Sequence, residues 1–483
     1  MTATKPLSLP VTAVLIPVVV LAVGVGALAA SSGAKGSIIA IGMVLMIVGC
    51  YVALVHPRVI YVVLAFALGV APVMVVPGVP VPFALAMVFA AWFALLTHPI
   101  VPLRITSVHI AVLGLVVAST IGMIMMNDGG KAHTFEYVKW TLATSLVFLL
   151  TMLSRSDLRA FGRAFVYGTT LGTALALALW RFDSAGTFMG HLAPLGYGQK
   201  GAIGTYQRYY ESSAGKVVRL TGTYVDPNLA GIFIFIALLL AITLFRGKRR
   251  LFLCAVLATG LIITLSRASI FSFVVGVVIL LLFGSMQARM RRGIIGAVAV
   301  AAVAALAIPA VNDRILSSFG SDDKGTKERA EALDNFTNSM RGHWWFGHGF
   351  GARELVNEVA GWKVNYVANS PLLTVYRAGI LAGIAFVVLL VVGAVWAYRN
   401  MRKTPWESGV IGAGFIGFSL VALQLDFPVV TQPPVTMAFS VFVAFLIANP
   451  IEPEDGTDGH TAELYSPDRP EAEIRDIAYA AAR

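Results

Sequence analysis

Charged residues and cysteines are both scarce in this chain of 483 residues. Asp, Glu, Lys and Arg together make up 13% of the chain, whereas hydrophobic residues make up 58%, and the mean hydropathy is +0.80. Such a composition lies far outside the range of soluble globular proteins. The two cysteines, Cys50 and Cys254, fall inside apolar runs and are expected to be core residues, so the sequence indicates neither a disulfide framework nor a cysteine metal site.

Long apolar runs recur from about residue 11 to residue 448. A bilayer requires about 20 mostly apolar residues per helix, and lipid cannot hydrogen-bond an open backbone, so the runs predict an all-α polytopic transmembrane bundle. About fourteen spans are expected, or twelve if the proline-rich third and fourth form one re-entrant pair, and the first is expected to be retained rather than cleaved. The predicted spans cover residues 11–30, 37–55, 59–76, 81–96, 105–126, 134–153, 160–180, 228–245, 251–265, 268–283, 293–311, 372–397, 409–425 and 435–448.

Positive charges exceed negative charges by 11 in this chain. Nucleic-acid binding is one reading of that excess, but basic clusters such as RGKRR and QARMRR fall on alternate connections between the predicted spans. Cytoplasmic loops of membrane proteins are enriched in Lys and Arg, and these loops contact anionic lipids. We therefore expect a multi-pass protein with both termini in the cytoplasm, membrane lipids as partners and no nucleic-acid partner.

The same topology places two long loops, residues 181–227 and 312–370, on the outer side. Loops of this length are usually functional. Residues 1–449 are expected to form the transmembrane domain, and the acidic residues 450–483 a disordered cytoplasmic tail.

The first polar motif is RLTGTYVDPNLAGIF, in which Arg219, Asp226 and Asn228 stand at the outer start of an apolar run. Asp226 precedes a proline and is equally well explained as a helix cap. The second motif, TLSRASIFSF, puts Arg267 in a tight outer turn between two spans. An arginine there either extends to the interface or binds an anion, since a guanidinium can grip phosphate oxygens bidentately.

The third motif lies in the second loop, where Arg329, Arg341 and His348 accompany the stretch WWFGHGFG. The glycines permit tight turns around His348, which is either structural or a proton acceptor. The two histidines of this loop give little support for a metal because no Cys or carboxylate partners stand at ligand spacing.

The last motif, ANSPLLTVYRAGILAGI, begins with Asn369 and Ser370, which either cap a helix or position substrate. Arg377 lies inside the apolar run that follows, so it is expected to face the bundle interior. Asp426, at the outer end of a later run, is expected to pair with one of the arginines or to accept a proton, pairing being favoured.

The order and spacing of these motifs over residues 219–383 resemble the O-antigen ligase and O-antigen polymerase superfamily of bacterial membrane glycosyltransferases. The resemblance implies a GT-C-like helical fold, a polyprenyl-diphosphate-linked glycan donor, a glycan or glycolipid acceptor, and catalysis on the outer face of the cytoplasmic membrane without a cofactor, metal or nucleotide sugar. Other envelope-polysaccharide assembly proteins are further candidate partners. Arg219, Arg267 and Arg329 occupy the positions where the family's arginines bind the diphosphate, and Arg341 and Arg377 are added from their motifs.

The family commonly has a histidine beside an asparagine near the start of the late helix, where this sequence has Ala368, Asn369 and Ser370. His348 is therefore the first candidate for a catalytic base, with Asp226 and Asp426 as substitutes, and Asn228, Asn369 and Ser370 are candidates for positioning substrate. We expect a glycosyltransferase that polymerises or transfers a polyprenyl-diphosphate-linked oligosaccharide during cell-envelope polysaccharide synthesis. The alternatives are a ligase that transfers a finished glycan, and a flippase that binds the same lipid without chemistry.

Overall fold

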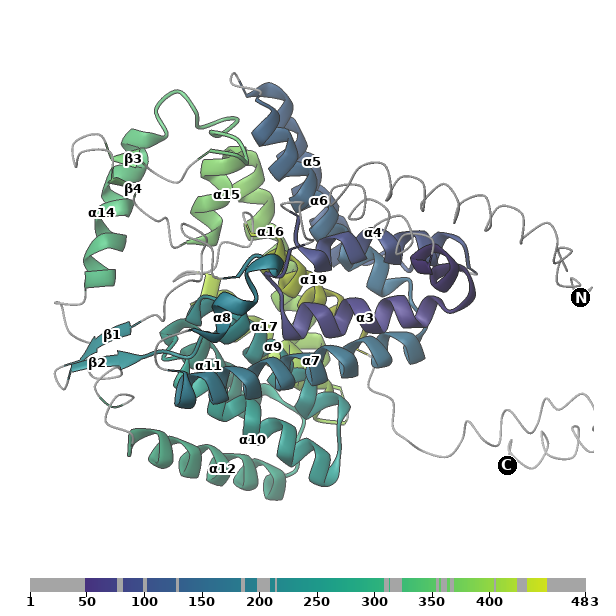
Figure 1. Ribbon diagram of the computed structural model, residues 1–483, viewed down its shortest axis with the longest axis vertical. Helices are drawn as coiled ribbons and strands as arrows, with labels where there is room; N and C mark the ends of the chain where they lie inside the picture. The colour runs from purple at the N-terminus through teal and green to yellow at the C-terminus, as the bar shows by residue number, and fades with distance from the viewer. Residues whose placement is uncertain are drawn as a thin grey trace, which may run out of the picture.

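The computed structural model, shown in Figure 1, is a bundle of α-helices with two small antiparallel hairpins at its edge. It describes residues 48–449 except for 76–80, 99–101, 127–129, 184–186, 198–208, 213–214, 308–311, 313–323, 353–355, 358–362, 365–368, 404 and 424–431. The predicted span 11–30, most of the span 37–55, the tail 450–483 and Asp426 lie outside the described residues.

Most of the long helices coincide with predicted apolar runs. In chain order the helices and strands are α3 (Pro57–Val70), α4 (Phe83–Leu96), α5 (Ser107–Met125), α6 (Lys131–Thr151), α7 (Arg155–Phe182), α8 (Phe188–His191), η1 (Ala193–Leu195), β1 (Tyr209–Ser212), β2 (Gly215–Val218), η2 (Gly222–Tyr224), α9 (Pro227–Leu244), α10 (Gly247–Ile263), α11 (Arg267–Phe283), α12 (Ala288–Leu306), α14 (Lys324–Ser339), β3 (Val356–Asn357), β4 (Lys363–Val364), α15 (Ser370–Ala378), α16 (Ile380–Met401), α17 (Ser408–Gly417), the π-helix η3 (Phe418–Ala422) and α19 (Pro433–Ala448). By contrast, α8, α14 and the four strands lie in the two segments that were predicted to be long loops.

Helix α9 lies at the centre of the bundle and is buried along almost its whole length. Around it α3 packs on α7, α5 on α16, α6 on α19 and α11 on α17. Close approach depends on small residues, as is usual between membrane helices. A Cβ at Gly69 of α3 would lie 2.6 Å from the carbonyl oxygen of Phe165 in α7, and a Cβ at Gly168 of α7 would overlap the carbonyl oxygen of Phe66.

Three of the described helices, α5, α9 and α16, are long and apolar enough to cross a membrane. Residues 48–55 and α3 together would make a fourth span, although the chain bends by 116° between them. Shorter apolar helices include α4, α11 and α19. The protein is thus a helical membrane protein, while the full count of twelve to fourteen spans stays a prediction.

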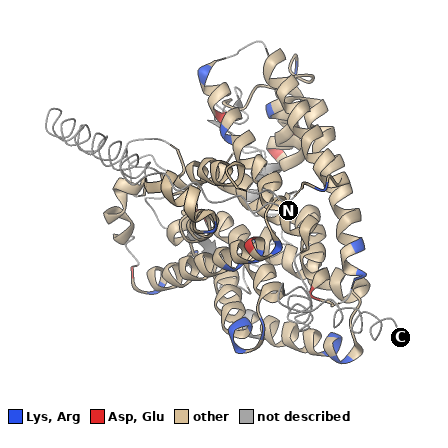
Figure 2. Cartoon of the chain, turned by 90° about the vertical axis from the view of Figure 1, so that its right-hand side faces the viewer, with Lys and Arg blue, Asp and Glu red and all other residues tan. Residues whose placement is uncertain are grey.

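Polar contacts join neighbouring helix ends at both ends of the bundle, and the assignment of these ends to the two sides of the membrane stays a prediction. Arg58 pairs with Asp157 at 3.6 Å, and Arg250 pairs with Glu407 at 3.3 Å, so each ion pair joins two connections expected in the cytoplasm. At the opposite end, the Thr223 hydroxyl in the first long loop donates to the carbonyl oxygen of Val70, the last residue of α3, at 2.5 Å. In Figure 2 most of the ribbon is tan, and the blue segments lie mainly near helix ends.

The predicted single span 372–397 is wrong, because the chain breaks into α15 and α16 at Gly379. Gly379 has φ +85°, and a Cβ there would overlap the carbonyl oxygen of Trp345. Hydropathy does not register such a break because both halves are apolar. The predicted span 409–425 also departs from a regular α-helix, since it continues from α17 into the π-helix η3.

The two cysteines do not both belong to the protein core, contrary to the expectation from their apolar runs. Cys50 is exposed and Cys254 is half-buried. An apolar run in a membrane protein has lipid-facing as well as protein-facing sides, so hydropathy alone does not assign a residue to the interior.

Candidate functional site

The first two polar motifs meet at the N-terminal end of α9. Arg219 donates from Nε to the carbonyl oxygen of Thr264 at 3.0 Å and from a terminal nitrogen to Oδ1 of Asn228 at 2.9 Å. Thr264 ends α10, so Arg219 links the start of α9 to the turn between α10 and α11. Residues 45 positions apart in sequence are therefore brought together at one end of the bundle.

Arg267 is the first residue of α11 and follows this turn directly. The turn is tight, because Leu265 has φ +51° and Ser266 is fully buried. The hydroxyl of Ser266 lies 3.3 Å from that of Ser269, and Gly231 of α9 leaves room for both serines. Arg267 itself is half-buried, so the fold holds a cation at this polar end without fully removing it from solvent.

Asp226 caps the N-terminus of α9, which is one of the two roles that the sequence predicted for it. Its carboxylate accepts from the backbone N–H of Asn228 at 2.8 Å and of Leu229 at 3.3 Å. Pro227 occupies the first turn, where its missing N–H costs nothing. A side chain engaged in this way has a structural role whether or not it also contacts substrate.

Substitution of Asp226 separates these two roles. We expect Asp226→Ala to destabilise the protein by about 1 kcal/mol because two helix donors lose their acceptor, whereas Asp226→Asn keeps a good cap and changes stability little. Thermal unfolding and product formation should be measured for both variants. An asparagine variant with normal unfolding but no activity would show that the carboxylate takes part in the chemistry.

A second polar group forms around His348, in the segment 341–352 between α14 and α15. The His348 ring stacks on the His343 ring with 4.0 Å between centroids. It also packs against the Tyr376 ring, with 4.6 Å between centroids. Its Nε2 lies 2.9 Å from the carbonyl oxygen of Ser339. Because a carbonyl only accepts, Nε2 must carry the proton, which leaves Nδ1 as the basic nitrogen of the neutral ring.

Glycines allow this segment to lie against neighbouring backbone. Gly347 has φ +68°, and a Cβ there would lie 2.7 Å from the backbone of Arg377. Gly349 has φ +86°, and a Cβ there would overlap Nδ1 of His133 in α6. Phe350 then packs on Trp140 with 5.0 Å between ring centroids, which fixes the segment to α6.

Arg377 holds the same segment from α15. It is 6% exposed, as its place in an apolar run predicted, and its Nη1 donates to the carbonyl oxygen of Phe350 at 2.9 Å and to that of Ala352. The structure thus gives Arg377 a positioning role for the His348 segment that sequence reasoning missed. In the sequence, the only signal of this role was an arginine placed in an apolar run soon after a glycine-rich loop.

The remaining predicted site residues make fewer described contacts with these two polar groups. Asn369 caps α15 by accepting from the N–H of Leu372 at 3.0 Å, and Ser370 is fully buried beside it. Arg341 is exposed. Arg329 belongs to α14, but its side chain lies outside the described part of the structure, as does Asp426.

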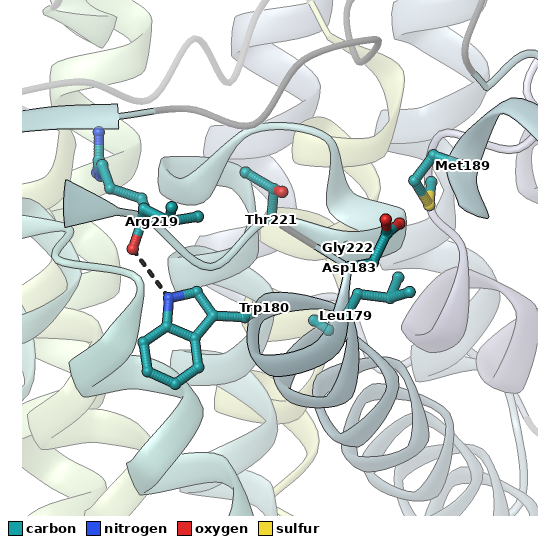
Figure 3. Close-up of a pocket in the computed structure, with 9 residues that line it drawn as sticks. Leu179, Trp180, Asp183, Met189, Arg219, Thr221 and Gly222 are labelled. Carbon is teal, nitrogen blue, oxygen red and sulfur yellow. Dashed lines mark hydrogen bonds between the residues drawn. The ribbon is translucent and has the colours of Figure 1, made fainter. Parts of the chain in front are cut away.

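A small cavity lies next to Arg219, between the end of α7 and the segment 218–222 (Figure 3). Trp180 closes one side by donating to the carbonyl oxygen of Val218 at 2.9 Å, and Figure 3 shows the Arg219 guanidinium extending away from Trp180. The cavity volume is about 30 Å³, which suffices for about one water molecule. It cannot hold a sugar or a diphosphate.

Among the described residues, no three His, Cys, Asp or Glu side chains gather as metal ligands. The polar chemistry is instead cationic, with arginines at the start of α11 and in α15, and one histidine with a basic nitrogen.

These features define a helical membrane protein with a polar, arginine-containing end. Residues 252–387 match the family described as O-Antigen ligase, so this part of the chain is similar to that family. The predicted resemblance is thereby confirmed, and the match includes Arg267, Arg341, His348 and Arg377 but not Arg219, Asp226 or Asn228. A comparison with curated proteins found no match.

Proposed function

We propose that this protein is a membrane glycosyltransferase that polymerises or transfers a polyprenyl-diphosphate-linked oligosaccharide on the outer face of the cytoplasmic membrane. The similarity to the O-antigen ligase family supports transfer of lipid-linked glycans in envelope polysaccharide synthesis. The observation that carries the proposal is the contact of Arg219 with the α10–α11 turn, because it joins the α9 motif to the start of α11, where Arg267 lies.

The arginines suit the leaving group of such a reaction. The acceptor hydroxyl oxygen forms a bond to the anomeric carbon, the bond from that carbon to the diphosphate oxygen breaks, and the lipid diphosphate departs with additional negative charge. Fixed cations in a poorly hydrated site stabilise this charge more than water does. We assign this contact to Arg267 first, with Arg219 positioning the turn through Thr264 and contributing charge beside it.

The base that accepts the hydroxyl proton is His348 in this proposal. Burial lowers the pKa of His348 below its ordinary value, and the nearby charges of His343 and Arg377 lower it further, against the opposing effect of the Ser339 carbonyl. The imidazole is therefore neutral at pH 7, with Nδ1 able to accept a proton. General-base assistance is worth about 10² to 10⁴ in rate.

We expect His348→Gln to lower kcat by about 10² or more while donor affinity changes little. Glutamine can keep the donation to Ser339 but cannot take up a proton, which separates the chemical role from the structural one. In the wild type, kcat should fall as pH drops through the lowered pKa, since protonation removes the base. The same protonation should also destabilise the fold at acid pH, because the unfolded histidine binds its proton at a higher pH than the folded one.

The matched control is His343→Gln, which alters the stacked neighbour without removing the proposed base. Rates measured from pH 5 to 8 should keep their acid limb in the control and lose it in His348→Gln. An unchanged rate in His348→Gln would exclude His348 and leave Asp226 and Asp426 as the candidates.

The function itself is tested with purified protein in detergent and a purified polyprenyl-diphosphate oligosaccharide. A polymerase is expected to produce a ladder of longer glycans from the donor alone. A ligase, the activity in the family's description, is expected to leave the glycan length unchanged and to join the glycan to a glycolipid acceptor once that acceptor is added. A flippase would leave the glycan unchanged in detergent and move it across sealed vesicles. That last result would overturn the proposal.

A further inference from the structure

A second feature of the molecule is an apolar groove between α7 and α10, away from the residues assigned to glycan transfer. Its volume is about 440 Å³, within the range of about 300–1,000 Å³ typical of ligand sites. Its walls include Tyr167 and Leu171 of α7, and Phe252 of α10. These three side chains are 44%, 53% and 65% exposed, so the groove opens outward from the bundle.

The groove lies toward the end of the bundle that carries the basic connections. Tyr167 contacts Phe245, the residue that ends α9, with 5.2 Å between ring centroids. Arg249, which lines the groove, stands in the first turn of α10, next to the Arg250–Glu407 ion pair. The positive-inside rule predicts that this end of the bundle lies in the cytoplasmic half of the membrane.

Two arginines stand where the groove meets this end. Arg249 is exposed and belongs to the groove wall, and Arg163 is exposed on α7. Arg163 precedes Tyr167 by four residues and Leu171 by eight, so all three share one face of the helix. Among the described residues, no acidic side chain lies within ion-pair distance of either arginine. The same face is thus cationic near the cytoplasm and apolar deeper in the membrane.

We propose that this groove binds one anionic phospholipid of the cytoplasmic leaflet, with an acyl chain against Tyr167, Leu171 and Phe252 and the headgroup phosphate against Arg249 and Arg163. An apolar groove that ends in two arginines complements both the acyl chain and the phosphate of such a lipid. Each basic residue near an anionic membrane surface contributes about 1 kcal/mol, or about fivefold in affinity. A second protein copy is a poorer occupant, because a symmetric contact would bring like charges together.

The test is native mass spectrometry of the full-length protein with phosphatidylglycerol and phosphatidylcholine of identical acyl chains. We expect wild type to retain phosphatidylglycerol preferentially, and Arg163→Gln with Arg249→Gln to lose about fivefold in that preference for each arginine removed. Arg289→Gln removes an exposed cation from α12 and serves as the matched control, with retention expected to be unchanged.

Ala174→Trp provides an independent variant, because it fills the groove while keeping both arginines. We expect it to lower retention of both lipids, provided that size-exclusion chromatography shows the folded protein. Equal retention of the two lipids by wild type, or an equal loss in Arg289→Gln, would overturn the proposal. Retention of an uncharged polyprenol in place of phosphatidylglycerol would overturn it as well, by identifying the groove as a site for the donor's tail.

Discussion

Arg267→Ala is expected to reduce product formation by about 10² to 10³, the cost of removing one preorganised charge-stabilising donor from an active site. Arg267 is half-buried at the first position of α11, directly after a turn whose backbone is held by Arg219. In the proposed reaction, loss of this guanidinium removes positive charge where the leaving diphosphate gains negative charge, and the helices around it are expected to stay packed. Turnover of purified lipid-linked donor measures the effect.

Two further variants make this result specific. Arg267→Lys keeps the charge but not the planar pair of donors, so its activity should lie between those of wild type and Arg267→Ala. Arg289→Ala removes an exposed arginine from α12 and should leave turnover unchanged. Wild-type turnover in Arg267→Ala, with normal unfolding, would remove Arg267 from the proposed diphosphate site.

Arg377→Ala is expected to have the largest effect on stability. Arg377 is 6% exposed and donates to the carbonyl oxygens of Phe350 and Ala352, so its loss leaves buried acceptors without this donor. Each unsatisfied buried group costs about 1–3 kcal/mol. The expected result is a lowered midpoint of thermal unfolding and a low kcat, because the segment carrying His348 is no longer held against α15.

The control for this prediction is Arg341→Ala. Arg341 belongs to the same segment but is exposed, so its removal should change the unfolding midpoint little. Arg377→Lys should not restore the wild type, since an ammonium is a compact charge that lacks the guanidinium's rigid set of donors. An unfolding midpoint of Arg377→Ala equal to that of wild type would contradict the positioning role.

Hydropathy and local signals were sufficient to predict most helices of the described region. The apolar run 228–245 became α9 with bounds one residue earlier at each end, and the Asp-Pro pair before it predicted the cap that Asp226 forms. The order of the motifs also predicted the O-antigen ligase family. These features depend on residues close together in the chain, so they can be predicted without a tertiary structure.

The glycine break between α15 and α16 could not be predicted in the same way. Gly379 lies between two apolar stretches, and its constraint comes from Trp345, 34 positions earlier in the sequence. The roles of Arg219 and Arg377 were likewise incompletely predicted, because each donates to a backbone carbonyl of a distant segment, that of Thr264 and that of Phe350 respectively. A carbonyl carries no side-chain signature, so no motif reveals it as an acceptor.

The sequence by itself determined that this protein is a helical membrane protein, and it predicted the family that residues 252–387 match. The tertiary structure alone decided that Arg219 joins α9 to the α10–α11 turn and that Arg377 anchors the His348 segment. The physical reason is that apolar burial in a bilayer follows composition, whereas a hydrogen bond between distant segments forms only when packing brings the two atoms together.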